Sequence, residues 1–262
     1  MTATDPTTSD VESKGLKGGS LGLVSSIVMG VASTAPAYSL AASLGLIVAS
    51  GGALLAGVKA PGIVLLAFIP MYLIAVAYQE LNRAEPDCGT TFTWATRAFG
   101  PVTGWMGGWG IIVADVIVMA NLAQIAGSYS FTLLGQFGVP GMSDLSNSTL
   151  WSTVAGLLWI ALMTWICYRG IEISARLQYF LLSIEVVILI AFAVFALIRV
   201  YSGTAESYSL VPTLDWFNPF TLDFTKVIAP AMLTAIFIYW GWDTAVSVNE
   251  ETADPAKTPG RA

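Results

Sequence analysis

Long runs of apolar residues, separated by short polar segments, dominate the chain from residue 21 onward. A helix that crosses the hydrocarbon core of a bilayer, about 30 Å thick, needs about 20 such residues. Charge-poor runs of this length predict six membrane-spanning helices, at about 21–49, 61–80, 101–134, 150–168, 176–199 and 227–248. The pattern therefore predicts an all-α polytopic membrane protein, with a transmembrane domain over residues 21–262.

The N-terminal segment 1–20 is polar and lacks the apolar stretch of a signal peptide. We interpret it as a disordered cytoplasmic tail. When the loops alternate between the two sides of the membrane, eight of the 11 Lys and Arg residues fall on the side of the N-terminus and three on the other. Because cytoplasmic loops are enriched in basic residues, we expect a multi-pass protein of the cell membrane with a cytoplasmic N-terminus.

Composition supports this class and excludes several functions. Hydrophobic residues make up 55% of the chain and charged residues 11%, whereas soluble domains are about 45–50% apolar and about 25% charged. The net charge of −6 argues against nucleic-acid binding, and the absence of histidine excludes histidine-based catalytic triads and metal sites. Cys88 and Cys167 do not have metal-ligand spacing. We therefore expect no enzyme, no metal and no cofactor.

The first predicted span is interrupted near its middle. Pro36 removes a backbone N–H and clashes with the preceding turn, which frees carbonyl groups about four residues earlier. The segment from Gly30 onward is small, with hydroxyls at Ser33 and Thr34, so a small ligand can approach the backbone there. A packed proline kink whose lost bonds are replaced by the hydroxyls stays open as an alternative.

The sixth predicted span is also interrupted. It holds Gly241 and then Asp243, and a carboxylate at the bilayer centre costs at least about 2.5–3.5 kcal/mol, which marks a functional residue. Two broken helices five spans apart are typical of transporters built from inverted repeats, whose half-helix ends face a site at the membrane midplane. The N-terminus of a half-helix suits a carboxylate, and its C-terminus suits an ammonium group.

Three acidic residues and no basic residue lie at predicted membrane depth: Asp115, Glu185 and Asp243. A lone buried carboxylate is costly unless it is protonated or paired with a cation. We therefore expect a substrate that carries a positive charge, whether as an amine, a cationic amino acid or the ammonium of a zwitterion. Acids that are permanently protonated, or bonded to neighbouring serines and amides, stay open as the alternative, and for Asp115 the two interpretations are balanced.

Three stretches of the chain form a recognisable pattern. The first is 80–83 with Pro86, Gly89, Trp94 and the 99–109 segment; the second is 239–243 with Glu250, Glu251, Pro255 and 259–262; the third, which matches more loosely, is 29–37. These stretches resemble amino acid permeases of the amino acid–polyamine–organocation (APC) superfamily. Together they extend over nearly the whole chain but correspond to only the first half of a family member.

The resemblance implies a LeuT-like fold, in which two five-helix repeats are inverted relative to each other within a chain of usually twelve helices. This chain would supply helices one to six, so we expect an incomplete transporter that stops before the second repeat is complete. Association of two such chains into a homo-oligomer stays open.

The resemblance also implies which residues form the site. The first-helix break of the family binds the substrate carboxylate, and an aromatic residue before the sixth-helix glycine closes the pocket. The corresponding residues here are Gly30, Val31, Ala32, Ser33 and Thr34, followed by Tyr239 or Trp240 and Gly241. Asp243 is in the position of an acid linked to proton or substrate coupling. Glu185 takes the position where several relatives carry a lysine, which argues against a lysine-based coupling mechanism.

These predictions favour a secondary active transporter that moves amino acids or related amines by alternating access, through proton coupling or exchange. Its partners would be a small-molecule substrate and the lipid bilayer. A membrane-embedded amino acid receptor or sensor is the alternative, although it would need a cytoplasmic partner domain.

Overall fold

The computed structural model describes residues 15–52 and 55–262, and these residues form helices without a β-strand. In chain order the α-helices are α2 (Leu23–Ser33), α3 (Pro36–Ala49), α4 (Ala60–Ala84), α5 (Thr91–Phe99), α6 (Pro101–Gln136), α7 (Met142–Asn147), α8 (Thr149–Tyr168), α9 (Ile171–Tyr201), α10 (Ala229–Ile236), α11 (Thr244–Ser247) and α12 (Thr258–Arg261). Short 3₁₀ turns are η2 (Gly57–Lys59), η3 (Leu214–Phe217), η4 (Pro219–Thr221), η6 (Phe237–Tyr239) and η7 (Asn249–Glu251), and η5 (Phe224–Ile228) is a π-helical turn. The predicted all-α class is confirmed.

Six helical spans of the described residues are long and apolar enough to cross a membrane. They are Leu23–Ala49, Gly57–Ala84, Pro101–Gln136, Thr149–Tyr168, Ile171–Tyr201 and Phe224–Ser247. Each contains most of one run predicted from hydropathy, and the ends differ by up to five residues. The ends differ because helices continue past the apolar run into polar caps, as at the C-terminal end of α4 near Arg83.

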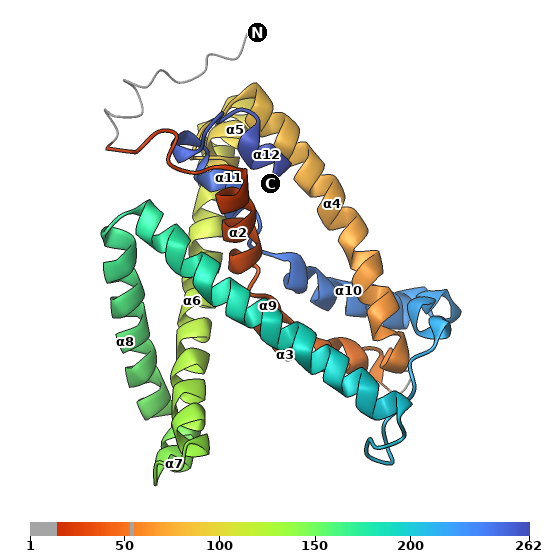
Figure 1. Cartoon of the computed structure of the whole chain (residues 1–262). Helices are drawn as coiled ribbons and strands as arrows, with labels where there is room; N and C mark the ends of the chain where they lie inside the picture. Colours follow the sequence, from red (N-terminus) through yellow and green to blue (C-terminus); the bar gives the residue numbers. More distant parts are fainter. Residues whose placement is uncertain (1–14, 53–54) are drawn as a thin grey trace. The chain divides into compact units, whose positions relative to one another are not determined.

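The described part of the chain folds as two compact units, which we consider separately. One unit contains the residues up to Cys88 together with Ala175–Ala262, and the other contains Gly89–Ser174. The first unit therefore holds both spans that the sequence predicts to be interrupted. The second unit holds α5, α6, α7 and α8 (Figure 1).

In the second unit, small residues bring helices into close contact. A Cβ atom built on Gly127 of α6 would overlap the Ser152 carbonyl oxygen of α8, and one built on Gly156 would lie 2.5 Å from the Ala123 carbonyl oxygen. Gly104 makes the same kind of contact with Thr96 of α5. Because lipid offers no hydrophobic drive for helix association, close backbone packing of this kind contributes to the attraction between these helices.

We expect Gly127→Ala to lower the melting temperature of the 262-residue chain in detergent. The added methyl group forces α6 and α8 apart, and overpacking of this kind costs about 1–3 kcal/mol. The matched control is Gly110→Ala on the same helix, where a Cβ meets no atom within 4 Å. A Gly127→Ala chain that melts at the same temperature as the Gly110→Ala chain would contradict this packing.

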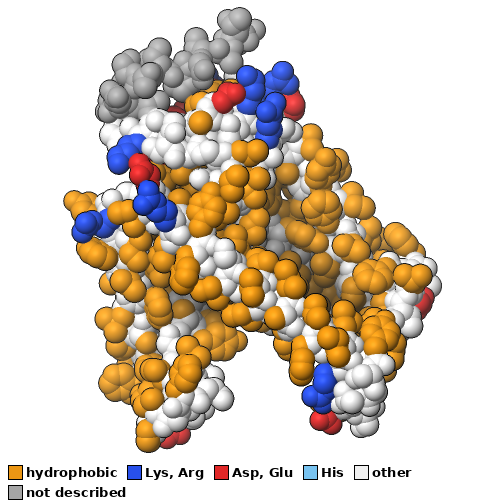
Figure 2. Space-filling view, in the orientation of Figure 1, with side chains coloured by type: hydrophobic (Ala, Val, Ile, Leu, Met, Phe, Trp, Pro, Cys, Tyr) orange, Lys and Arg blue, Asp and Glu red, His pale blue; other side chains and the backbone are white. Residues whose placement is uncertain are grey.

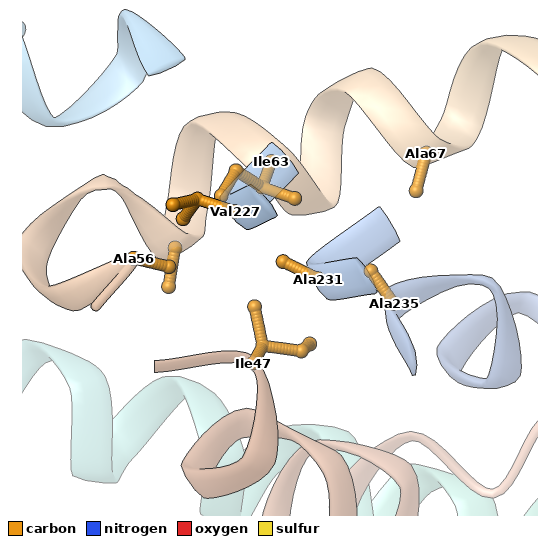
Figure 3. Packing of buried hydrophobic residues seen from close by; sticks show 8 residues of the cluster. Ile47, Ala56, Ile63, Ala67, Val227, Ala231 and Ala235 are labelled. Atoms are coloured by element: carbon orange, nitrogen blue, oxygen red, sulfur yellow. The ribbon is translucent and has the colours of Figure 1, made fainter. Parts of the chain in front are cut away.

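In the first unit, the buried apolar cluster joins α3, α4 and the sixth span. Its members are fully or almost fully buried and include Ile47, Ala56, Ile63, Ala67, Val227, Ala231 and Ala235, as Figure 3 shows. The alanines of α10 allow this short helix to approach both α3 and α4. The cluster therefore fixes the first half of the sixth span against the second half of the first span.

The surface has the character expected of a protein in lipid. Figure 2 shows hydrophobic side chains along the lengths of the helices, with Lys, Arg, Asp and Glu gathered near helix ends. Large apolar side chains such as Leu73, Phe192 and Leu158 are more than 60% exposed. An aqueous protein would not leave so much contiguous apolar surface uncovered, so the multi-pass membrane class follows from the structure as well as from the sequence.

Two contacts between distant segments agree with the prediction that successive loops lie on alternate sides of the membrane. Lys59 forms an ion pair with Asp215, and the sequence places both residues on the side opposite to the N-terminus. At the other end, the Lys17 N–H donates to Glu251 Oε1 at 3.1 Å. Lys17 belongs to the segment predicted to be a disordered tail; in the structure it has a defined partner at the exit of the sixth span, and residues 1–14 lie outside the described residues.

Candidate functional site

The first span is broken between α2 and α3 (Figure 1). Ala35 has a φ of +45°, in the left-handed region, and Pro36 begins the next helix. Of the two hydroxyls that the sequence places at the break, Thr34 Oγ1 donates to the Val31 carbonyl at 2.7 Å; Ser39 Oγ, which was not predicted to take part, donates to the Thr34 carbonyl at 2.5 Å. The left-handed residue Ala35 thus separates two helices, and hydroxyl groups replace part of the lost bonding, as the kink alternative expects.

The sixth span is broken after η6. Trp240 has extended backbone dihedral angles, and Gly241 has a φ of +99°, which favours glycine. Helical geometry resumes at Thr244, the first residue of α11, with Asp243 at the position just before it. The break lies between the aromatic pair Tyr239–Trp240 and Asp243, where the sequence predicts it.

The two breaks lie in direct contact. A Cβ atom built on Gly241 would be 2.5 Å from the carbonyl oxygen of Ser33, the last residue of α2. Gly30, one turn earlier in α2, would place a Cβ 3.4 Å from the Trp242 carbonyl oxygen and 3.4 Å from Ala245 Cβ. Glycine at 241 therefore lets the backbones of the first and sixth spans touch, and Gly30 lies within contact distance of the same segment.

An apolar pocket of about 370 Å³ lies beside this contact. It is lined by Thr34, Pro36, Leu40, Phe68, Met71, Tyr72, Ala75, Ile238, Tyr239 and Trp242. The Phe68 ring lies 5.7 Å from the rings of both Tyr72 and Tyr239, measured between centroids. The volume of this pocket is within the range of small-molecule sites, which are typically lined by apolar and aromatic side chains with few polar groups.

A second pocket, of about 220 Å³, is also lined by Thr34 and Trp242. It shares these two residues and Ala75 with the first pocket, and is otherwise lined by Ile27, Gly30, Val31, Gln79, Ala245, Val246, Pro259, Gly260 and Ala262. The Trp242 ring packs edge-on against Tyr78 of α4 at 5.1 Å. Trp242 is therefore one of the residues that line both pockets, and α4 holds its ring in place.

Beyond the second pocket, three segments are joined by buried hydrogen bonds. Asn249 Nδ2 donates to Asn82 Oδ1 at 2.7 Å, and Asn82 Nδ2 donates to the Pro255 carbonyl at 2.9 Å, with both asparagines fully buried. The N-terminal segment joins them, since the Ala253 N–H donates to the Leu21 carbonyl at 2.7 Å. The end of α4, the exit of the sixth span and the start of the first span are thus held together at this end of the unit.

Helix α9 contacts both halves of the broken first span. The Tyr179 hydroxyl lies 3.2 Å from Ser25 Oγ of α2. Two turns further on, Glu185 Oε1 accepts a hydrogen bond from the Ala37 N–H of α3 at 2.7 Å. Glu185 is therefore bonded to the first half-helix end after the break.

The structure gathers most of the predicted site residues at these two breaks. Gly30, Val31 and Thr34 line the smaller pocket, and Thr34 also lines the larger one. Ser33 and Gly241 form the contact between the breaks. Tyr239 lines the larger pocket, and its hydroxyl donates to the Val64 carbonyl at 2.9 Å. The break itself lies later than expected, because residues 30–33 are still helical; Ala32 belongs to α2 and lines neither pocket. Trp240 likewise lines neither and packs on the Phe237 ring.

Sequence reasoning missed the contribution of α4. Phe68, Met71 and Tyr72 line the larger pocket, and their spacing of three and four residues places them on one helix face. That aromatic and sulfur-containing face was visible in the sequence, but nothing in the sequence indicates which helix it meets. Asp115 lies in the second unit and is exposed on α6, whereas Asp243 is half-buried beside the break.

The comparison with protein families decides the assignment. The model of the family described as amino acid permease matches residues 21–262, nearly the entire chain. The chain belongs to the amino acid permease family. This confirms the predicted membership of the APC superfamily, and the LeuT-like fold is consistent with it.

Individual relatives are distant. The chain is 26% identical to the branched-chain amino acid permease BcaP of Lactococcus lactis, in a match that covers 77% of this chain and 44% of the permease. It is 24% identical to the methylthioribose transporter of Bacillus subtilis, over 74% of this chain and 40% of the transporter. It is 26% identical to the human large neutral amino acids transporter small subunit 2, over 72% of this chain and 34% of that protein, so the chain spans less than half the length of each. No solved structure matches the chain significantly.

We expect Gly241→Ala to lower the melting temperature of the chain markedly. The variant forces a side chain into a left-handed conformation, at a cost of about 1–2 kcal/mol, and places its methyl group against the Ser33 carbonyl. The control is Gly45→Ala on α3, where a Cβ meets no atom within 4 Å. Equal melting temperatures for the two variants would show that the breaks do not pack as described.

Proposed function

We propose that the protein acts as a secondary transporter, or as part of one, that moves amino acids or related amines across the cell membrane by alternating access. The observation that carries the proposal is the contact between the break at Ala35 and the break at Gly241, with a pocket beside it. Broken helices at corresponding positions of two repeats are the structural signature of midplane substrate sites. The cytoplasmic placement of the N-terminus is part of this proposal.

The relatives support the same class of activity. Their names describe a permease for branched-chain amino acids, a transporter of methylthioribose and a transporter of large neutral amino acids. All are transporters and none is named as an enzyme, which supports a protein without catalytic activity. The apolar and aromatic lining of the larger pocket suits a substrate with an apolar portion.

Uptake of labelled substrates tests the proposal directly. The full-length gene product is reconstituted in proteoliposomes and offered radiolabelled leucine, lysine and ethanolamine, with and without a proton gradient, and with unlabelled substrate inside. Saturable uptake that the gradient or internal substrate stimulates supports the transporter. Saturable binding without uptake would instead indicate the sensor, and the absence of both would contradict any role in amino acid or amine recognition.

The end of α2 favours a positively charged group. A helix C-terminus carries the negative end of the helix dipole, and Thr34, the C-cap residue of α2, lines the pocket. Tyr239 and Trp242 line the pocket, and cation–π attraction to such rings is worth about 0.5–2 kcal/mol. We propose that the substrate carries an ammonium group and that this group lies at the end of α2.

We expect amines and amino acids with an ammonium group to compete best against one labelled substrate. The panel contains lysine, arginine, ethanolamine and polyamines on one side and dicarboxylic amino acids and simple carboxylates on the other. Inhibition that is strongest for the dicarboxylic acids, with no effect of the amines, would contradict the proposed charge of the substrate.

We propose that Asp243, together with Glu185, links substrate movement to a proton or to the bound ammonium. Asp243 precedes α11 directly after the break, whereas Asp115 lies on the continuous helix α6. Asp243→Asn is therefore expected to reduce the initial uptake rate at least tenfold, and Asp115→Asn less than twofold, at equal surface expression. Equal rates in the two variants would reject this ranking.

A further inference from the structure

The smaller pocket lies against the last turn of α2, since Gly30, Val31 and Thr34 line it. The backbone N–H groups at this end of α2 are already bonded. The Thr34 N–H donates to the Gly30 and Val31 carbonyls at 3.3 and 3.2 Å, and the Ala35 N–H donates to the Ala32 carbonyl at 3.0 Å. A ligand that accepts hydrogen bonds in this pocket therefore needs donors from another segment.

Two other side chains that line the smaller pocket carry donors without a hydrogen-bond partner in the described part of the chain. They are the indole N–H of Trp242, in the sixth span, and the side-chain amide of Gln79, in α4. Neither group is among the buried polar atoms, so both are accessible. An unbonded polar group within a membrane span is costly, so we expect an acceptor to approach these two donors.

Helix α4 helps to hold both donors in place. The Trp242 ring packs edge-on against the ring of Tyr78 at 5.1 Å. The next residue, Gln79, is packed along its stem, because a Cβ atom built on Gly260 of α12 would lie 2.9 Å from Gln79 Cγ and 3.2 Å from its Cα. Donors that are fixed before a ligand arrives lose less entropy on binding.

We propose that the smaller pocket binds the carboxylate of the substrate, with the Trp242 indole N–H and the Gln79 amide as donors. A carboxylate has two oxygens that accept several hydrogen bonds at once, and hydrogen bonds to a charged acceptor are stronger than those between neutral groups. The two side chains supply donors that the bonded backbone of α2 does not.

The position of Thr34 connects this carboxylate to the proposed ammonium. Thr34 is the C-cap residue of α2 and lines both pockets, and an α-amino acid carries its ammonium and its carboxylate on one carbon atom. An ammonium at the end of α2 therefore brings the carboxylate close to the smaller pocket. The inference rests on the proposed function, and within it selects α-amino acids over simple amines.

The test compares amino acids with the amines that lack only their carboxylate, namely leucine with isopentylamine and phenylalanine with phenethylamine. Equilibrium dissociation constants are measured on the full-length gene product in nanodiscs, for wild type, Trp242→Phe, Gln79→Leu and Trp216→Phe. The matched control is Trp216→Phe, which removes an indole N–H from a residue of η3 that lines neither pocket. The quantity of interest is the dissociation constant of the amino acid divided by that of its amine.

In wild type we expect this ratio to be below one, because the amine leaves both donors without their acceptor. Trp242→Phe keeps an aromatic ring beside Tyr78 but removes the N–H, so it should raise the ratio about tenfold. Gln79→Leu should raise it by a similar factor, since an apolar side chain of nearly equal size replaces the amide. Trp216→Phe should leave the ratio within about twofold of wild type.

Several results would overturn the inference. A wild-type ratio of one or more would do so while leaving the proposed function intact, because the protein would then bind simple amines at least as well as amino acids. An unchanged ratio in Trp242→Phe or in Gln79→Leu would also overturn it, including the case in which amino acid and amine lose affinity equally, which would assign the residue to packing. A shift of equal size in Trp216→Phe would contradict it as well.

Chromatographic profiles and melting curves identify any variant that fails to fold. If Trp242→Phe does not fold, 3-benzothienylalanine is incorporated at position 242, where its ring sulfur replaces the N–H, and its ratio decides. For position 79 the second variant is Gln79→Glu, which should raise the ratio because its carboxylate repels that of the ligand. An unchanged ratio in the deciding variant overturns the inference. Failure of wild type to bind any of the four ligands would overturn the proposed function and, with it, the inference.

Discussion

The close approach of two interrupted helices is the constraint on which the first unit depends. Gly241 lies against the Ser33 carbonyl, and Gly30 lies against Trp242 and Ala245. A side chain at Gly241 would push the two helices apart, whereas one at Gly30 would be in ordinary van der Waals contact with Ala245. Separation of the helices would also disturb Thr34 and Trp242, which line both pockets. The core of Ile47, Ala231 and their neighbours holds α3, the second half of the first span, against α10, the first half of the sixth (Figure 3).

The membrane makes this arrangement demanding, because a broken helix exposes backbone groups that lipid cannot bond. The structure satisfies these groups in different ways at the two ends of the first break. Hydroxyl groups of Thr34 and Ser39 donate to carbonyls at the end of α2 and in the break, while the carboxylate of Glu185 accepts the first N–H of α3. Side chains therefore satisfy backbone groups on both sides of the first break: hydroxyl groups at the carbonyl end, and the Glu185 carboxyl group at the N–H end.

Much of this was predictable from the sequence, and the exceptions have physical reasons. Hydropathy predicted six spans because a helix must be apolar over a minimum length to cross a bilayer. Pro36 and Gly241 indicated the breaks, because proline lacks a backbone N–H and glycine adopts backbone angles that interrupt a helix. The sequence predicted the first break within 30–34, but the structure has it at Ala35. Residues 30–33 stay helical, and the Thr34 hydroxyl donates to the Val31 carbonyl there. The partners of Glu185 and of the α4 face bearing Phe68 depend on tertiary packing, which one-dimensional periodicity does not encode.

Cysteine cross-linking between the two broken helices tests the central claim most directly. With Cys88 and Cys167 replaced by serine, Gly30→Cys and Ala245→Cys are combined in the 262-residue chain and oxidised with copper phenanthroline. The built Cβ of Gly30 lies 3.4 Å from Ala245 Cβ, close to the roughly 3.5–4.5 Å span of disulfides. We predict an intramolecular disulfide for this pair by mass spectrometry, and none for Gly45→Cys with Ala245→Cys. Two free, alkylatable thiols at positions 30 and 245 after oxidation would contradict the account.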